Sequence, residues 1–298
     1  MIVKKINPQG YCKGVILALK KCIEVINNPD TIKPVYLLGM IIHNKLVCKS
    51  LEEKGIVILE GNDKMKLLDK ISGGTVIISA HGVSDKVKEK ALSKNLNLVD
   101  TTCPDVKKVH DNVKKYINEG YEVLYIGKEN HPEAIGVLEE SNKITLIDNL
   151  ETIEKIDGNK KYYVTNQTTL AHSYLEVFHE KIKENIHQVV VENNICLATT
   201  NREKALYDLE ADLIVVVGDN KSSNTKKLYE TAIKKAHSKM VIAIERACDL
   251  LNYDLTNIQE AHITSGASTP KETVDQVIRF LQSDCKDLSI LDEKLLFF

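Results

Sequence analysis

The sequence predicts an α/β protein of three similar lobes around one shared centre. Cys12, Cys103 and Cys196 lie 91 and 93 residues apart in a chain of 298 residues, so their interval is nearly even. Each cysteine follows an apolar run typical of a strand and precedes apolar residues at helical spacing. Two further apolar runs after each cysteine end in polar clusters. An evenly repeated pattern of this kind indicates a repeated structural unit.

The repeat divides the chain into four parts. The lobes are expected at residues 1–97, 98–192 and 193–283, about 95 residues each, and residues 284–298 are a C-terminal tail. The end of that tail, Leu295-Leu296-Phe297-Phe298, is apolar and is expected to pack on a neighbour or to mark a contact surface.

The cysteine runs show the pattern most clearly around Cys103. The run 97–100 leads into Cys103, and Pro104 suits the first position of the next helix because its missing N–H would be unpaired there. A thiol at that point meets the positive end of the helix dipole, which favours the thiolate. The runs 2–6 and 188–191 lead into Cys12 and Cys196 in the same way.

The other apolar runs supply polar residues at their ends. The clusters that follow them are His43-Asn44, His81-Gly82, His131-Pro132-Glu133, Gln167-Thr168-Thr169, Ser222-Ser223-Asn224 and Ser268-Thr269. Strands that end in polar residues just before a helix present binding sites in open α/β sheets. After His81, Ser84 is expected to cap the following helix.

Composition excludes several classes of partner. The formal net charge is −2 and the pI is near 6.5, so no general preference for nucleic acid or anionic membranes is expected. No apolar run approaches the roughly 18 residues of a membrane span, and residues 1–5 lack the apolar core of a signal peptide. We therefore expect a cytoplasmic protein.

The cysteines predict a metal site assembled from distant segments. No Cys-x-x-Cys pair occurs among the seven cysteines, which excludes zinc ribbons and thioredoxin-type motifs. Three thiolates suit an iron–sulfur cluster or zinc, and three ligands leave one metal position open for substrate. Buried structural cysteine is the alternative for any single residue, but the triple spacing outweighs it. Cys22 lies on a helical packing stripe and is expected in the core, whereas Cys48 receives no role.

Seven residues at the strand ends predict an anion pocket. Imidazoles, hydroxyls and an amide near helix N-termini suit a phosphate or diphosphate. These residues are His43, His81, His131, Ser222, Ser223, Asn224 and Ser268. The other histidines, His110, His172, His179, His187, His237 and His262, are expected to be structural or on the surface.

Glu133 is the candidate proton donor or base. It is the one carboxylate at a repeat-equivalent strand end, and Thr168 is its expected hydroxyl partner. A carboxylic acid beside a metal site suits acid–base catalysis. The alternative is a glutamate that only stabilises a helix N-terminus.

The motifs together resemble one known family. They run in order from residue 10 to about 283: Gly10-Tyr11-Cys12-Lys13-Gly14-Val15, His43-Asn44, Ser79-Ala80-His81-Gly82-Val83-Ser84, Thr102-Cys103-Pro104, His131-Pro132-Glu133, Gln167-Thr168-Thr169, Ile195–Arg202, Ser222-Ser223-Asn224 and Gly266–Pro270. With these motifs in this order, the chain resembles the family of 4-hydroxy-3-methylbut-2-enyl diphosphate reductases. These enzymes are oxidoreductases of the non-mevalonate isoprenoid pathway.

The resemblance implies a trefoil of three lobes around one [4Fe–4S] cluster, with Cys12, Cys103 and Cys196 as ligands and one iron open. It implies two-electron reductive dehydroxylation of (E)-4-hydroxy-3-methylbut-2-enyl diphosphate to isopentenyl and dimethylallyl diphosphates. Glu133 would relay protons, Thr168 would place the substrate hydroxyl, and the seven residues above would hold the diphosphate. Ferredoxin or flavodoxin would donate electrons, since the chain has no Gly-x-Gly-x-x-Gly fingerprint.

The chain departs from the family pattern at Leu17, where an arginine is usual, at Val137-Leu138-Glu139, where a glycine-rich continuation is usual, and at Glu203, where glutamine is usual. Three alternatives stay open. They are a non-catalytic iron–sulfur electron-transfer or sensor protein, a three-cysteine zinc enzyme acting on a phosphorylated compound, and a divergent paralogue acting on another diphosphate.

Overall fold

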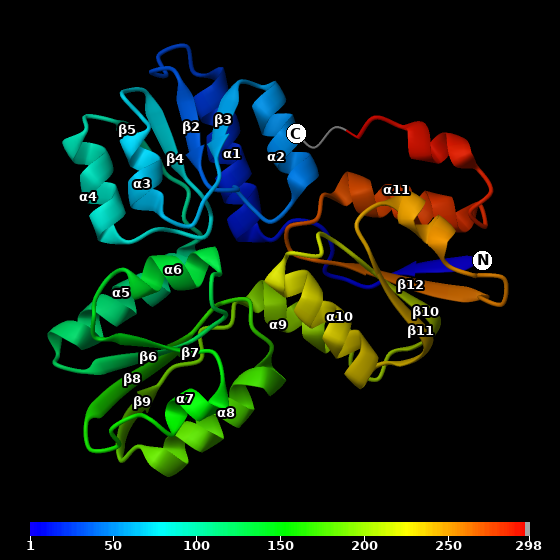
Figure 1. The fold of residues 1–298 in the computed structure, drawn as a ribbon. Coiled ribbons are helices and arrows are strands. Elements are labelled where there is room, and N and C mark those ends of the chain that lie inside the picture. The colour runs from blue at the N-terminus through cyan, green and yellow to red at the C-terminus, as the bar shows by residue number, and fades with distance from the viewer. Residues whose placement is uncertain (296–298) are drawn as a thin grey trace. The chain divides into compact units, whose positions relative to one another are not determined.

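Parallel β-sheets flanked by helices make up the fold (Figure 1). The computed structural model describes residues 1–295, and within them the strands form three four-stranded sheets. Every strand pair in these sheets is parallel. The predicted α/β class with three repeated sheets is confirmed.

The first sheet contains β2 (Val35–Leu38), β3 (Ile56–Leu59), β4 (Thr75–Ile78) and β5 (Asn97–Asp100), in the order β3-β2-β4-β5. In chain order, α1 (Lys13–Asn27) precedes these strands, and α2 (Lys45–Glu53), α3 (Lys64–Asp69) and α4 (Asp85–Ser93) lie between them. Parallel strands need such crossover helices, because the chain must return to the starting end of the sheet before the next parallel strand can begin.

The second sheet contains β6 (Glu122–Ile126), β7 (Ile144–Ile147), β8 (Lys161–Asn166) and β9 (Gln188–Val191), in the order β7-β6-β8-β9. Its helices are α5 (Pro104–Asn118), α6 (Pro132–Leu138), α7 (Leu150–Ile153) and α8 (His172–Asn185). Pro104 begins α5 as expected, with Cys103 at the N-cap position.

The third sheet contains β1 (Ile2–Lys5), β10 (Glu210–Val217), β11 (His237–Ile244) and β12 (Glu260–Ser265), in the order β1-β12-β10-β11. It is accompanied by α9 (Leu197–Lys204), α10 (Ser223–Lys235), α11 (Lys271–Gln282) and the 3₁₀ helices η1 (Ala247–Asn252) and η2 (Leu288–Asp292).

Strand pairing differs from the expected lobe assignment at two strands. We expected β1 in the first lobe, but it pairs with β12, with Ile2 opposite Glu260. We placed most of β5 in the second lobe, but it pairs with β4 in the first sheet. The reason is that β5 and β9, the strands before Cys103 and Cys196, complete the preceding sheet rather than starting the next one, and β1, the strand before Cys12, is an edge strand of the third sheet. Because β1 completes the third sheet, that sheet joins the two ends of the chain.

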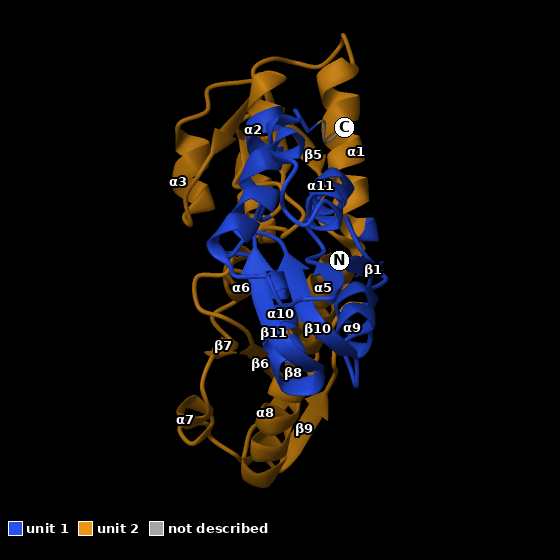
Figure 2. Cartoon of the chain, turned by 90° about the vertical axis from the view of Figure 1, so that its right-hand side faces the viewer, with its two compact units in different colours: residues 1–13, 43–50, 197–298 blue, residues 14–42, 51–196 orange. Residues whose placement is uncertain are grey.

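Two compact units make up the structure (Figure 2). Unit 1 contains residues 1–13, residues 43–50 and the chain from Leu197 onward, and so holds the third sheet. Unit 2 contains residues 14–42 and 51–196, and so holds the other two sheets. Among residues 1–295, no helix has the length and apolar character required to cross a membrane.

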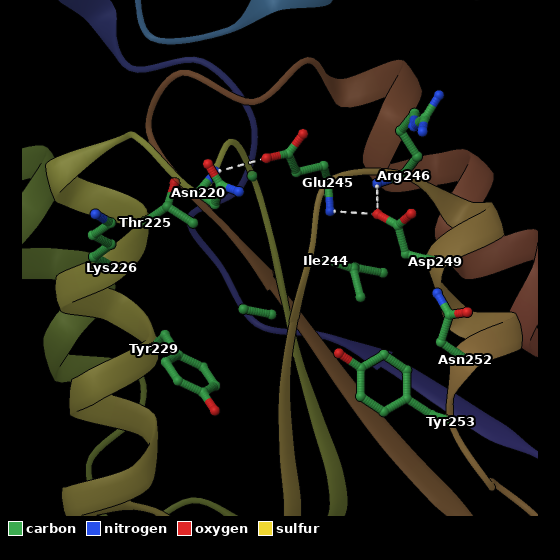
Figure 3. Close-up of a pocket in the computed structure, with 12 residues that line it drawn as sticks. Asn220, Thr225, Lys226, Tyr229, Ile244, Glu245, Arg246, Asp249, Asn252 and Tyr253 are labelled. Atoms are coloured by element: carbon green, nitrogen blue, oxygen red, sulfur yellow. Dashed lines mark hydrogen bonds between the residues drawn. The ribbon is translucent and has the colours of Figure 1, made fainter.

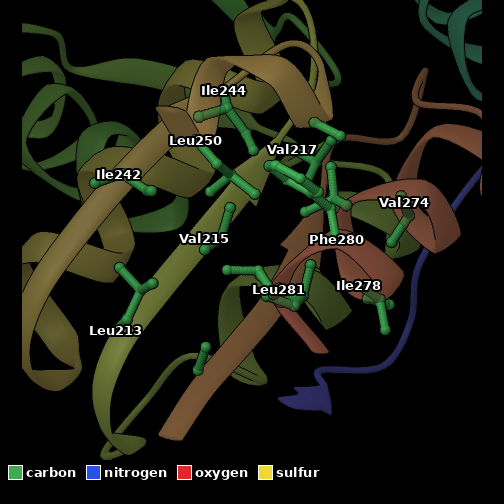
Figure 4. Packing of buried hydrophobic residues seen from close by; sticks show 14 residues of the cluster. Leu213, Val215, Val217, Ile242, Ile244, Leu250, Val274, Ile278, Phe280 and Leu281 are labelled. Carbon is green, nitrogen blue, oxygen red and sulfur yellow. The ribbon is translucent and has the colours of Figure 1, made fainter. Parts of the chain in front are cut away.

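A large apolar cluster joins the third sheet to α11 and η1 (Figure 4). Val215, Val217, Phe280 and Leu281 belong to it and are fully buried. The chain after α11 packs on the same cluster through Ile290 and Leu291, and Gln276 Nε2 donates a hydrogen bond to the Ile290 carbonyl at 2.8 Å. Part of the predicted tail therefore packs on its own chain, whereas residues 296–298 of the predicted contact segment lie outside the described residues.

Candidate functional site

In unit 1, two predicted anion-binding residues, Ser222 and Asn224, lie at the start of α10, which follows β10 of the third sheet. Ser222 is the N-cap of α10, and its Oγ accepts the Thr225 N–H at 3.3 Å. Asn224 is buried, and its side chain is bound at both ends. Its Oδ1 accepts the Ala267 N–H at 2.9 Å, and its Nδ2 donates to Thr199 Oγ1 at 3.1 Å.

Ala267 links these residues to the first predicted metal ligand. The Cys12 N–H donates to the Ala267 carbonyl at 3.0 Å, and the adjacent Ser268 Oγ donates to the His43 carbonyl at 3.2 Å. The structure therefore brings Cys12, His43, Asn224 and Ser268 together within unit 1. Burial lowers the pKa of His43, with Asp219 opposing and Lys221 adding to the shift, so the imidazole is neutral near pH 7.

Two glycines make room for a threonine hydroxyl beside these loops. A Cβ added at Gly218 or Gly266 would lie 2.6 Å or 2.2 Å from Thr225 Oγ1. Gly218 also has a φ of +157°. A side chain at either position would collide with the first turn of α10, so glycine keeps the two loops close to that helix.

Arg202 has a structural role that its place in the motif Ile195–Arg202 does not reveal. Its side chain is buried and donates to the carbonyls of Gly10 at 2.7 Å, Ser265 at 3.1 Å and Ala198 at 3.1 Å. It therefore fixes the segment before Cys12 against the end of β12 and the start of α9. Charge-assisted bonds to three carbonyls stabilise this junction more strongly than neutral bonds would.

In unit 2, Glu133 lies at the start of α6 and is almost completely buried. Oε1 accepts the Thr168 N–H at 2.7 Å and Oε2 accepts the Thr168 hydroxyl at 3.1 Å, as the sequence predicted for this pair. The Tyr125 hydroxyl donates to Oε1 at 3.4 Å. Burial raises the pKa of Glu133 to about 7, although the bonds from Thr168 and Tyr125 oppose the shift.

The two cysteines of unit 2 lie beside predicted site residues. The Cys196 N–H donates to the Thr168 carbonyl at 3.0 Å, and Thr168 in turn donates to Glu133. The Cys103 N–H donates to the Ala80 carbonyl at 3.0 Å, next to His81. Both thiols are partly exposed, whereas Cys22 and Cys48 are buried, as predicted for Cys22.

His81 and His131 form an edge-to-face pair with ring centroids 5.8 Å apart. His131 is the N-cap of α6, and its Nδ1 accepts the Glu133 N–H at 3.2 Å. His81 Nδ1 lies 3.5 Å from Ser79 Oγ. Within unit 2, His81 therefore lies beside His131, and Glu133 contacts Thr168.

A metal-ligand group is not assembled in the described structure. Within residues 1–295, no three His, Cys, Asp or Glu side chains lie together in a way that could hold a metal ion. The donor chemistry nevertheless suits a thiophilic metal, because three thiols are available, and Cys12, Cys103 and Cys196 each follow an edge strand of a parallel sheet. The ligand set stays a prediction.

One expectation about unit 2 needs correction. Ser84 occupies the N-cap position of α4 but makes no capping hydrogen bond, because its hydroxyl donates to Glu139 instead. His110 has a structural place, one of the two expected for it: it is buried, and Nδ1 lies 2.7 Å from Glu140 Oε1. Nothing in sequence spacing indicates this pair, because its members are 30 residues apart.

A pocket of about 460 Å³ lies at the carboxyl ends of β10 and β11 (Figure 3). Tyr229 and Tyr253 project into it from opposite sides, and Asn220 and Arg246 lie at its upper end in the view. It contains none of the residues that the sequence predicted for the site.

Comparison with known proteins identifies the relatives of the chain. The profile of the family described as LytB protein matches residues 3–282. A 4-hydroxy-3-methylbut-2-enyl diphosphate reductase of Anoxybacillus flavithermus is 41% identical over 291 residues, which cover 95% of this chain and 90% of that protein. The enzyme of the same name from Symbiobacterium thermophilum is 40% identical and covers 95% of this chain and 97% of its own.

Two solved structures agree with the sequence relatives. The E-1-hydroxy-2-methyl-but-2-enyl-4-diphosphate reductase of Plasmodium falciparum is 34% identical with a TM-score of 0.85, and the match covers 94% of this chain and 88% of that one. A structure of (E)-4-hydroxy-3-methyl-but-2-enyl diphosphate reductase, named as the terminal enzyme of the non-mevalonate pathway, is 30% identical with a TM-score of 0.69 and coverage of 95% and 100%. The chain therefore belongs to the LytB protein family.

Proposed function

We propose that this chain reduces (E)-4-hydroxy-3-methylbut-2-enyl diphosphate to isopentenyl and dimethylallyl diphosphates. The names of its relatives support the reaction. The observation that carries the proposal is Glu133, a buried carboxyl with a pKa of about 7, bound to Thr168 beside Cys196. A protein that only carried electrons would not need such an acid.

Family membership supports an iron–sulfur cofactor in general. The finer proposal is one [4Fe–4S] cluster, with Cys12, Cys103 and Cys196 as the residues that would hold it and one iron without a cysteine ligand. When bound, the cluster would pass on, one at a time, the electrons that an external reductant supplies, and would offer an open coordination position. The positions of Cys103 at a helix N-cap and of all three thiols after parallel strands support this ligand set.

The chain's own polar residues would bind and orient the diphosphate. In unit 1, Ser222, Ser223, Asn224 and Ser268 offer hydroxyl and amide donors, and His43 adds a neutral imidazole. In unit 2, His81 and His131 offer imidazole donors. Binding through the diphosphate would orient the allylic end of the substrate for reaction.

Glu133 would deliver the proton that the leaving hydroxyl requires. The overall reaction takes up two electrons and two protons and releases water, so the C–O bond breaks as oxygen gains a proton. A carboxyl with a pKa near 7 is protonated in about half of the molecules at neutrality. Thr168, which binds both Glu133 oxygens, would place the substrate hydroxyl at that acid.

The electrons must come from another protein. A reductase of this kind needs a small-molecule substrate and a reductant, and we propose ferredoxin or flavodoxin for the second role. The missing dinucleotide fingerprint in the sequence supports a protein donor.

Anaerobic purification with iron and sulfide analysis tests the proposal first. Brown protein that converts the allylic diphosphate with an artificial reductant is the expected result. Colourless protein containing zinc would support the zinc enzyme instead. A loaded cluster without conversion would favour an electron carrier, a sensor or a paralogue with another diphosphate, which a panel of allylic diphosphates would separate.

A further inference from the structure

The end of α6 is anchored to the start of α4 by two consecutive glutamates. Glu139 Oε2 accepts the Ser84 hydroxyl at 3.1 Å, and Glu140 Oε2 accepts the Asp85 N–H at 3.3 Å. Glu140 therefore takes the place of the capping acceptor that Ser84 does not supply.

His110 of α5 completes this group. Its Nδ1–H donates to Glu140 Oε1 at 2.7 Å, and the two side chains are 7% and 5% exposed. Its Nε2 has no hydrogen-bond partner within the described residues. The ring is therefore held by the hydrogen bond to Glu140 at one nitrogen and by packing at the other. Leaving the second nitrogen buried and unpaired costs folding stability.

The His110 ring is packed against the segment that follows His81. A Cβ added at Gly82 would lie 3.3 Å from Nε2, and one at Gly136 would lie 3.5 Å from Cε1 and 3.3 Å from the Val83 Cα. Residues 82 and 83 thus lie between α5 and α6, and a Cβ at Gly82 or Gly136 would make close contacts that require small shifts of its neighbours. Gly82 also has a φ of +75°, which favours glycine.

Charged neighbours balance the two glutamates. Lys64 is 9% exposed, donates to the Gly61 carbonyl at 2.7 Å and attracts Glu139 electrostatically. Lys114 pairs with Asp85 at 2.8 Å beside Glu140. The Glu140 side chain is 5% exposed and Glu139 is partly buried, and such carboxylates are stabilised when nearby cations compensate their charge.

We propose that His110, Glu139 and Glu140, here called the α6 cluster, position His81 relative to His131. His131 caps the N-terminus of α6, and Glu139 and Glu140 follow at its C-terminus. Together with His110 of α5, these two glutamates hold the segment after His81. The pair of imidazoles, 5.8 Å apart, thereby keeps one separation and one angle. This inference rests on the proposed function, because the imidazoles matter through the diphosphate that they would bind.

Glu140→Ala in the cluster-loaded enzyme is the direct test. Displaced imidazoles should weaken diphosphate binding, so we expect KM to rise about tenfold while kcat stays within about twofold. Inorganic diphosphate should inhibit correspondingly less well. Glu140→Gln keeps an acceptor for Nδ1–H and should restore most of the wild-type KM. Hydrogen exchange of the amides of residues 80–85 should accelerate in the alanine variant alone.

Glu260→Ala is the matched control. It breaks another histidine–glutamate contact, His262 Nε2 to Glu260 Oε1 at 2.5 Å, at the amino end of β12. It should leave KM and exchange at residues 80–85 unchanged. If Glu140→Ala does not fold, Glu139→Ala removes the Ser84 bond and the attraction to Lys64 but keeps the His110–Glu140 contact, and it should also raise KM.

The outcomes separate the two proposals. A wild-type KM in Glu140→Ala, or a fall in kcat alone, would overturn the positioning role. Equal KM values for Glu140→Gln and Glu140→Ala would also overturn it, because the retained acceptor would then have no effect. A loaded wild-type enzyme that converts no allylic diphosphate would overturn the proposed function, and exchange at residues 80–85 would still decide whether the α6 cluster holds that segment.

Discussion

The predicted site residues of the two units differ in chemistry. In unit 1 they are mainly hydroxyls and an amide fixed by hydrogen bonds to backbone, as Asn224 is by Ala267. Even the histidine there, His43, is kept neutral by burial. In unit 2 the corresponding residues include Glu133, an acid that titrates near neutrality.

This difference assigns different tasks to the two sets. Neutral donors held by backbone bind an anion with little dependence on pH, because they have no proton to lose in the working range. A buried carboxyl with a pKa of about 7 exchanges a proton easily there. We therefore expect unit 1 variants to change binding, and Glu133 variants to change turnover and pH dependence.

The thiols are the feature that both units share, and their loss should have the largest effect. Changing Cys12 in unit 1 or Cys196 in unit 2 to serine should abolish the cluster, because either change removes one of three thiolate ligands. Iron analysis and visible absorbance of anaerobic protein measure this. The control is Cys22→Ser, since Cys22 is 0% exposed in α1. A folded but colourless Cys22 variant would show that the wrong thiols were chosen.

Glu133→Gln should give the next largest effect. Glutamine keeps the size and can still accept the Thr168 N–H, but it has no acidic proton. Turnover should fall by about 10²–10⁴, the usual contribution of general acid catalysis, with unchanged affinity for inorganic diphosphate. Anaerobic assays with an artificial reductant measure both quantities. Turnover near the wild-type rate would mean that the proton comes from elsewhere and that the contrast between the units fails.

The same variant should change how stability depends on pH. The pKa of Glu133 is raised from 4.5 to about 7 in the folded state, so folding is favoured by the protonated acid. Wild-type stability should fall as pH rises from about 4.5 through about 7, by about 3 kcal/mol, and Glu133→Gln should lose this dependence. Denaturant unfolding of both proteins at about pH 5 and about pH 8 measures it. Parallel pH profiles would show that Glu133 is not the buried acid described here.

Contacts between residues that follow neighbouring parallel strands could be predicted from the sequence. Glu133 and Thr168 each follow an apolar run, and parallel strands present their carboxyl ends at one edge of a sheet. The Glu133–Thr168 contact was therefore predictable, because both residues follow neighbouring strands, β6 and β8.

Contacts that depend on which elements pack together could not be predicted from the sequence. β1 is half polar and Ile2 is 60% exposed, so nothing in the run shows that it pairs with β12. The strands β3, β7 and β11 were not predicted, because they lie at sheet edges and lead to none of the predicted polar clusters. Glu140 contacts His110 because α5 packs against α6, and neither sequence segment indicates this packing.

Ser222→Ala should give the smallest of these effects, and it tests the unit 1 side of the comparison. A hydroxyl that binds an anion contributes through a charge-assisted hydrogen bond, so diphosphate affinity should fall by about 1.5–3 kcal/mol. Ser222 Oγ also caps α10 by accepting the Thr225 N–H, and loss of a cap costs about 1 kcal/mol of stability in its own right. Asp63→Ala separates the two effects, because Asp63 caps α3 through the Lys66 N–H at 2.9 Å and belongs to no predicted site. Calorimetry with inorganic diphosphate and thermal unfolding should show that both variants lose stability but that only Ser222→Ala loses affinity, by the same factor on either side of pH 7. Equal affinity in Ser222→Ala and wild type would remove Ser222 from the anion site, and a loss that varied with pH across that range would mean that unit 1 also depends on a titrating group.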